Sequence, residues 1–182
     1  MNLLGTLARW YIPSFLKKWE LRRLFKITGE AFGVVPPPAE KMSLQELLDE
    51  YALFTRYEVE RVGDAIPQCD RIKKYLFDHA FQIGLEYKSL FGITSSRDAM
   101  YAARIMYRIL GIDFQGWETG EIEIRSCLFG RYYSSRTCRI ISALDAGLLA
   151  GLSGGGRLEF MERMTEGGAC CRARLIGGEG AV

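Results

Sequence analysis

Hydrophobic side chains recur at helical spacing through the first 110 residues of the chain. The helix that opens at Ser43 carries a capping box, in which the hydroxyl of Ser43 and the acid of Glu46 satisfy each other's backbone N–H groups. We expect helices over Leu3–Ile27 (one or two, with Pro13 near the start of the second), from Ser43 to about Val62, over about Asp70–Phe91, and from Thr94–Ser96 to near Gly111.

The pattern changes after residue 120. Strict alternation over Glu121–Arg125 predicts a strand with Ile122 and Ile124 on one face. A helix capped by Ser135 or Thr137 then runs to about Leu152, is apolar almost all round, and stops at three glycines. Two strands, roughly Arg157–Thr165 and Ala169–Ile176, follow, with a hairpin turn at 166–168. The fold class is therefore α+β, with N-terminal helices followed by a small antiparallel sheet and one buried crossing helix.

Charge and prolines divide the chain into three segments. Residues 1–33 form a helical arm rich in aromatic residues, and residues 1–26 carry a net charge of +5; the whole chain carries +2, so the rest is at −3. Residues 34–42 hold three consecutive prolines and are expected to be a stiff linker. Residues 43–182 are expected to form one domain. The arm is interpreted as packing its aromatic side on its own domain or on a dimer mate; contact with a membrane surface is the less favoured alternative.

Composition limits the classes of function. A net charge of +2 and the lack of a base-reading motif argue against nucleic acid as a partner. Five cysteines, an odd number, without a convincing signal peptide favour a reducing, cytoplasmic location. No stretch approaches the roughly 20 apolar residues of a membrane span. We expect a small-molecule ligand or substrate, a possible homodimer, and no cofactor.

Four of the five cysteines follow residue 120. Cys138, Ser142 and Asp145 lie on one face of the predicted buried helix, and a buried carboxylate needs hydrogen-bond partners or a wet pocket. With Cys127 before the helix and Cys171 in the last strand, this spacing resembles the C-terminal half of the L-2-amino-thiazoline-4-carboxylic acid hydrolase family. The likeness covers about a third of the chain. It departs from the family at Ser142, where another Cys is usual, and at Gly168, where an Asp is usual.

The resemblance implies a hydrolase that opens cyclic amidines related to 2-aminothiazoline-4-carboxylate. Such a reaction needs a thiolate or an activated water, and an acid for the leaving group. A position near a helix N-terminus favours a thiolate at Cys138. The only histidine, His79, falls on the inward stripe of its helix and is a candidate acid or base, although a core histidine is the commoner case. The candidate catalytic residues are Cys127, Cys138, Asp145, His79 and Glu166, and the candidate substrate-binding residues are Cys171, Ser142 and Arg104, the last from an arginine stripe suited to a carboxylate.

Two alternatives stay open from the residues alone. The cysteines can be small core residues of a non-catalytic ligand-binding or sensory module, since the same region is more distantly similar to 4-vinyl-reductase-type domains. A metal site ranks last, because no Cys-x-x-Cys pair is present and Cys170 and Cys171 are adjacent in a strand. An enzyme should have a polar, water-accessible pocket around Cys138 and Asp145, whereas a sensor should have a dry apolar one.

Overall fold

The computed structural model describes residues 2–38 and 41–178, and it has an α+β fold. Within those residues the order of elements is helices first, then a sheet interrupted by a helical pair. The elements are α1 (Leu3–Trp10), α2 (Ser14–Phe32), α3 (Leu44–Val62), α4 (Ile66–Phe91), α5 (Ser96–Ile109), β1 (Ile112–Gly116), β2 (Glu121–Cys127), η1 (Leu128–Arg131), α6 (Ser135–Ile141), α7 (Ala143–Ser153), β3 (Arg157–Glu162), η2 (Met164–Glu166) and β4 (Cys171–Ile176).

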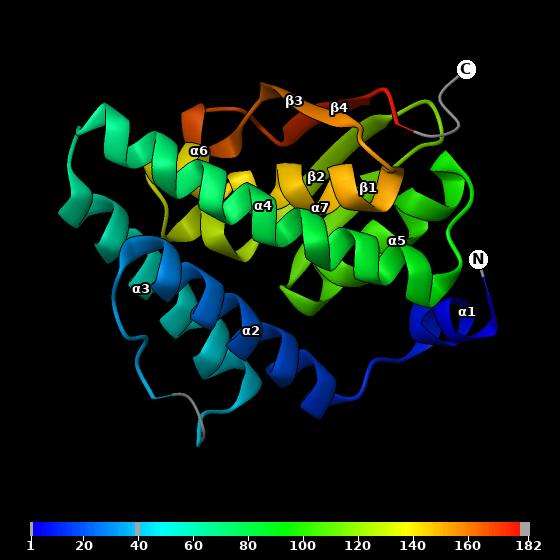
Figure 1. Cartoon of the computed structure of the whole chain (residues 1–182), viewed down its shortest axis with the longest axis horizontal. Coiled ribbons are helices and arrows are strands. Elements are labelled where there is room, and N and C mark those ends of the chain that lie inside the picture. The colour runs from blue at the N-terminus through cyan, green and yellow to red at the C-terminus, as the bar shows by residue number, and fades with distance from the viewer. Residues whose placement is uncertain (1, 39–40, 179–182) are drawn as a thin grey trace.

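The helices cover one face of a four-stranded antiparallel sheet with the order β1-β2-β4-β3. Helix α7 lies between α4 and the sheet, and α2 and α3 lie below α4 in the same view (Figure 1). Side chains of α2 and α3 share the main core with residues of the sheet. Alternate residues of β2 and β4 explain this arrangement. Ile124 pairs with Cys171 and Ile122 with Ala173, and all four side chains are buried, while their neighbours along the strands are more exposed. One face of the sheet therefore packs on helices and the other meets solvent.

Several helix boundaries follow from their local chemistry. The capping box of Ser43 and Glu46 is formed, with Ser43 Oγ 3.2 Å from the Glu46 amide and the Glu46 carboxylate 2.7 Å from the Ser43 amide. Pro13 is the N-cap of α2, and Gly154 ends α7 with a φ of 76°, a left-handed conformation that glycine adopts without steric cost. These three sequence predictions are confirmed.

Several elements differ from the sequence predictions. The strand expected to reach Thr165 ends at Glu162, and η2 over Met164–Glu166 forms part of the connection to β4 in place of a tight turn at 166–168. The single helix expected to reach Leu152 is two helices, because the chain bends at Ser142, which ends α6 and begins α7. A turn was expected over residues 115–120 and no strand before it, but Ile112–Gly116 forms edge strand β1 against β2, with a bulge between Asp113 and Phe114. Its apolar residues, Ile112 and Phe114, are buried by α5 and β2 and so favour a strand.

The N-terminal arm is half integrated into the body of the protein. Leu21 and Phe25 of α2 belong to the main core, and the Phe25 ring packs edge-on at 5.0 Å from Tyr51 of α3. The interpretation that the aromatic side of the arm packs on its own domain is correct for Phe25. Tyr11, Phe15 and Trp19 do not pack on the same chain, since they are 72%, 69% and 55% exposed. For these three side chains, contact with a dimer mate stays a prediction. The domain boundaries at 33 and 43 stay a prediction.

Glycines set the closest helix crossing, between α4 and α7. A Cβ atom at Gly147 would lie 2.3 Å from the Phe77 carbonyl oxygen, and one at Gly151 would lie 2.3 Å from that of Phe81. Gly84 of α4 is matched in the same way, because a Cβ atom there would lie 2.5 Å from the Leu148 carbonyl oxygen. Real Cβ atoms do not approach oxygens so closely. Only glycine on both helices lets the two backbones touch.

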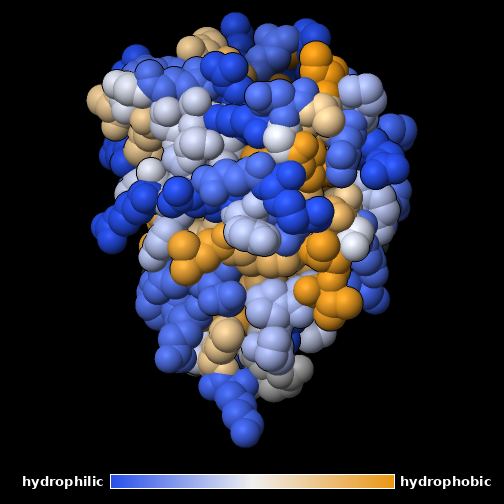
Figure 2. Space-filling view, turned by 90° about the vertical axis from the view of Figure 1, so that its left-hand side faces the viewer, coloured by the Kyte–Doolittle hydropathy of each residue, from blue (hydrophilic) through white to orange (hydrophobic). Residues whose placement is uncertain are grey.

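The end of the molecule where α3 leads into α4 has a mixed surface. Hydrophobic residues there form separate patches divided by hydrophilic ones (Figure 2). Across the described residues, 2–38 and 41–178, no helix combines the length and the apolar character needed to cross a bilayer.

Candidate functional site

A cavity of about 120 Å³ lies between the helices and the inner face of the sheet. That is several times the roughly 10–15 Å³ in which one water molecule can be held. Side chains from α2, α4, α5, α6, α7, β2, β3 and β4 contribute to its wall. Most of the lining is aliphatic or aromatic: Leu24, Tyr51, Ala80, Ile83, Met106, Ile109, Leu110, Ile112, Ile124, Phe129, Tyr133, Ile141, Leu144, Leu148, Phe160 and Met164.

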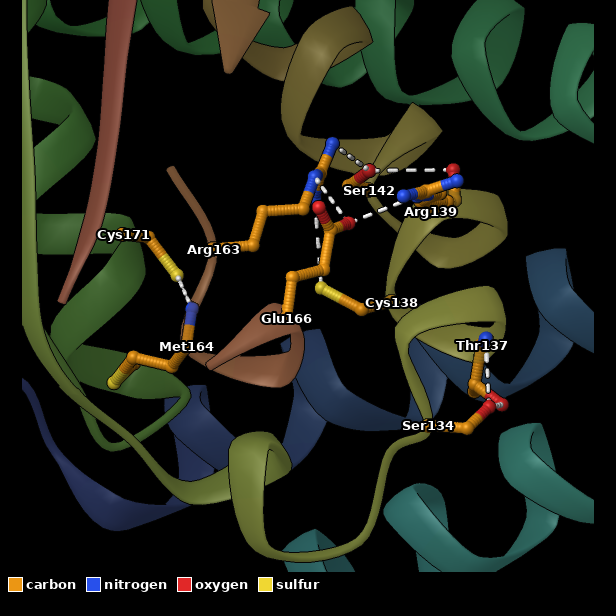
Figure 3. A network of polar contacts seen from close by, with 9 residues as sticks. All are labelled: Ser134, Thr137, Cys138, Arg139, Ser142, Arg163, Met164, Glu166 and Cys171. Atoms are coloured by element: carbon orange, nitrogen blue, oxygen red, sulfur yellow. Dashed lines mark hydrogen bonds and ion pairs between the residues drawn. The ribbon is translucent and has the colours of Figure 1, made fainter. Parts of the chain in front are cut away.

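Arg163, just after β3, organises the polar corner of the cavity. Its Nη1 donates to Cys138 Sγ at 3.5 Å and its Nη2 donates to Ser142 Oγ at 3.2 Å (Figure 3). The guanidinium carbon lies 3.7 Å from the centre of the Phe160 ring, a cation–π contact. The side chain is only 13% exposed. A guanidinium cannot lose its charge, so Arg163 gives this corner a fixed positive charge.

Glu166 in η2 balances that charge from outside the cavity. Its Oε1 lies 2.8 Å from Arg139 Nε and 3.8 Å from Arg163 Nε. The hydrogen bond from Arg139 lowers the pKa of the Glu166 carboxyl. Glu166 is therefore ionised at neutral pH. Its side chain is not part of the cavity wall. It positions Arg163 and Arg139.

Asp145, in the first turn of α7, is the acidic group of the same corner. The hydroxyl of Tyr107, a buried residue of α5, donates to Asp145 Oδ1 at 2.8 Å. Burial raises the pKa of Asp145 to about 6, although the Tyr107 hydrogen bond and the charge of Arg163 act in the opposite direction. Its carboxyl group can thus gain or lose a proton close to neutral pH.

Two of the cavity thiols, those of Cys127 and Cys171, are held in their protonated form. Burial raises the pKa of Cys127, at the end of β2, to about 12. Burial also raises the pKa of Cys171, whose Sγ accepts the Met164 N–H at 3.4 Å. A thiol needs to ionise before it acts as a nucleophile, so neither side chain is prepared for that role at neutral pH.

A second carboxyl group, Glu20 of α2, lies in another part of the cavity wall. It is 6% exposed and accepts a hydrogen bond from the Tyr87 hydroxyl. Burial raises the pKa of Glu20 to about 7, against the influence of the nearby Arg23. The two acids of the cavity, Glu20 and Asp145, are thus each bound by a tyrosine hydroxyl.

Five of the eight residues predicted from the sequence line this cavity: Cys127, Cys138, Ser142, Asp145 and Cys171. His79 does not. Its Nδ1 lies 2.9 Å from the Tyr75 carbonyl oxygen, and its ring stacks on that of Tyr75 at 4.0 Å. The inward face of α4 instead passes through Ala80 and Gly84, because α7 packs there.

Arg104 and Glu166 are also outside the cavity wall. Arg104 donates from Nη2 to Gln115 Oε1 at 2.5 Å and lies over the Tyr101 ring, on a shallow surface groove near Trp117. The structure thus separates the arginine stripe of α5 from the cysteine-rich region.

Sequence reasoning missed Arg163, Glu20 and Tyr107. Arg163 lies between two methionines in a strand-like stretch, and nothing in the local pattern marks its side chain as turned inward. Glu20 does carry a weak signal, since it is the one acid among six basic residues in the first 26. Tyr107 recurs at helical spacing with Met100, Ala103 and Leu110, which indicates a shared helix face but no role for its hydroxyl.

No group of three or more His, Cys, Asp or Glu side chains suited to a metal ion occurs in residues 2–38 and 41–178. Comparison with known proteins adds no candidate chemistry. No model of a protein family matches the chain, and no curated protein matches it.

Proposed function

We propose that this protein is a non-catalytic small-molecule-binding or sensory module, and that its ligand occupies the cavity between the helices and the sheet. The apolar lining of that cavity is the observation that carries the proposal. A pocket with mostly apolar walls and a few convergent polar groups is typical of a ligand site. The protonated thiols of Cys127 and Cys171 add soft, uncharged surface to the wall.

The polar corner limits the chemistry of the ligand. Arg163 offers N–H donors and a positive charge, and Asp145 offers an acceptor beside it. A small, largely apolar molecule with one polar group fits this arrangement, with its apolar body against Ile124, Leu144 and Leu148. Its polar group would bind at Arg163 and Asp145, which lie on the same side of the cavity.

A matched series of aromatic ligands tests the proposal. We expect benzoate, benzyl alcohol or benzylamine to raise the melting temperature of the full chain, because a ligand that binds only the folded state stabilises it. Replacement of Leu144, a cavity residue, by Phe should abolish that shift by filling the space. Leu158→Phe is the matched control, since Leu158 is also partly buried but does not line the cavity.

Isothermal titration with the best member of the series then measures affinity. Binding that survives Leu144→Phe unchanged, or that Leu158→Phe weakens equally, would contradict the cavity as the site. Among the three head groups, the preferred one identifies whether Arg163 or Asp145 dominates recognition. If benzoate binds best, Arg163→Met should remove the preference for benzoate over benzyl alcohol and benzylamine.

A hydrolase acting on cyclic amidines is the second candidate, favoured by one observation. Asp145 has a pKa of about 6 and lies in the cavity with Cys138, so it could serve as a general acid. Turnover of 2-aminothiazoline-4-carboxylate that Asp145→Asn abolishes would support it. Rapid alkylation of Cys138 in the native protein near neutral pH would identify a nucleophile. If neither turnover nor rapid alkylation is observed, the proposal of a binding module is favoured over the hydrolase.

A further inference from the structure

The outward side of α1 and of the first turns of α2 exposes a series of large apolar side chains at intervals of four residues. Leu3, Leu7, Tyr11, Phe15 and Trp19 are 75%, 57%, 72%, 69% and 55% exposed. Single exposed hydrophobic residues are normal on a protein surface, but five within one short segment mark an interaction site. We call these five residues the apolar series.

The segment that carries the apolar series is fixed to the protein. Ile12, between the two helices, is buried against Ile105, Met106 and Ile109 of α5. Leu21 is fully buried in the main core. Helix α1 and the start of α2 follow one another on the side of the molecule away from the sheet (Figure 1). The apolar series is thus displayed by folded structure.

Basic residues share the outer face of α2 with the two aromatic ones. Phe15, Trp19, Arg22 and Lys26 follow at helical spacing and are all exposed, and Arg23 places its guanidinium 5.8 Å from the Trp19 ring. Between residues 14 and 29 the only acid is Glu20, which turns inward to the cavity and to the Tyr87 hydroxyl. Glu30 continues the same spacing and lies 4.0 Å from Lys26 Nζ, and Glu86 of α4 pairs with Arg23 at 2.7 Å. The outer face is therefore aromatic, and basic residues outnumber acidic ones on it.

We propose that this face docks the protein on an anionic lipid bilayer surface, with the apolar series in the headgroup region and Arg22 and Lys26 near the lipid phosphates. Aromatic and leucine side chains next to lysine and arginine are the combination that interfacial helices use. Each basic residue near an anionic surface adds to the attraction between protein and bilayer. A second copy of the chain fits less well, because a two-fold contact would bring the same basic residues face to face.

Helix α2 also forms part of the cavity wall through Glu20 and Leu24. One helix therefore has a lipid-facing side and a cavity-facing side. If the cavity binds apolar ligands, as the proposed function holds, docking would bring it to the phase in which such ligands concentrate. The docking proposal itself stands on the outer face alone.

Sedimentation of the full chain with lipid vesicles tests the proposal. We expect binding to vesicles of phosphatidylcholine mixed with phosphatidylglycerol, weaker binding to pure phosphatidylcholine, and further weakening as salt rises. The double variant Phe15→Ser/Trp19→Ser should bind at least about tenfold more weakly, since two exposed aromatic anchors are removed. Both side chains are exposed, so the fold should persist, which circular dichroism would verify.

Matched controls come from other surfaces of the chain. Tyr57→Ser/Ile66→Ser removes two residues that are 64% and 72% exposed, and it should leave vesicle binding unchanged. Arg22→Gln/Lys26→Gln should remove the preference for anionic vesicles, whereas Lys73→Gln/Lys74→Gln on α4 should not. Equal binding by all four variants and the native chain would overturn the proposal. A second outcome would also overturn it: the native chain does not bind vesicles, light scattering shows that it is a dimer, and only Phe15→Ser/Trp19→Ser loses that dimer. A second copy of the chain would then cover the face.

Discussion

Helix α7 meets two neighbours in opposite ways. On the side of α4, Gly147 and Gly151 bring the two backbones into contact, with no room for a single methyl group. Toward the sheet, Leu144, Asp145 and Leu148 border a cavity of about 120 Å³. Apart from Asp145, the sequence of α7 is apolar on both sides, so the hydrophobicity of the other side chains does not separate them. The size of the side chains does.

The difference shows how a small domain can keep a hollow space beside a close-packed one. Glycines allow α7 to pack directly against α4, and the inner face of the sheet carries small side chains at Ala173 and Cys171. The helix cannot move onto the sheet without losing its contact with α4. Close packing of α7 on α4 therefore keeps the cavity between α7 and the sheet open.

The largest expected effect is on the packed side. Gly151→Ala should lower the free energy of unfolding by about 2–3 kcal/mol, because the new methyl group would meet the Phe81 carbonyl and the Gly84 backbone. Urea denaturation at neutral pH measures the change. Gly130→Ala is the control, since a Cβ there meets nothing within 4 Å, and its effect should be small. Equal stability of the two variants would mean that the α4–α7 contact is adaptable.

An intermediate effect is expected from Asp145 and depends on pH. Because burial raises its pKa to about 6 in the folded protein, the folded state holds the proton more tightly than the unfolded state, whose pKa is near 4. This group therefore costs no stability below about pH 4, and its cost grows as pH rises from there through 6 and is constant above. Asp145→Asn should remove that cost, so the variant gains on the order of 1–2 kcal/mol relative to the native chain between pH 4 and 7.

The matched control for this titration is Asp64→Asn, whose carboxyl is 98% exposed. This substitution should change the free energy of unfolding by no more than about 0.5 kcal/mol, as is usual for exposed surface positions. Glu20, with a pKa of about 7, adds a loss of stability between about pH 4.5 and 7 that Asp145→Asn leaves in place. A constant difference between Asp145→Asn and the native chain across pH would contradict the buried position of this acid.

The smallest effect is expected on the hollow side. Leu144→Phe adds volume next to the cavity, so its stability should stay within about 1 kcal/mol of the native chain, even though it is expected to abolish the proposed ligand binding. A larger side chain is thus expected to lower the free energy of unfolding substantially at Gly151 and only slightly at Leu144. A loss as large as that of Gly151→Ala would show that the cavity collapses in solution.

Much of the fold was predictable because its signals are local. The capping box at Ser43, the proline before α2 and the glycine after α7 each act within one turn of helix. Strand β1 was missed, since five residues with only two buried side chains resemble a turn. The bend at Ser142 was missed as well, because residues on both sides favour a helix and only the packing of α7 on α4 separates them.

The candidate site was predictable to the extent that its residues lie on α6, on α7 and on two strands close to them in the sequence. Spacing alone placed Cys138, Ser142 and Asp145 together, and the structure adds Cys127 and Cys171 to the same cavity. The sequence pattern put His79 on the inward face of α4, but the neighbouring residue Ala80 lies there, because Gly147 of α7 packs against it. Which charged residues turn inward, as Glu20 does, depends on tertiary contacts that no local pattern encodes.

Asn2 joins the beginning of α1 to the end of α4. Its Oδ1 accepts the Gly5 amide at 3.1 Å, its Nδ2 donates to the Leu90 carbonyl at 2.8 Å, and its backbone N–H donates to the Phe91 carbonyl at 2.7 Å. A helix of eight residues does not persist alone in water. The amide protons of α1 are therefore expected to exchange with solvent in step with the last turn of α4, so that the two ends open and close as a single cooperative unit.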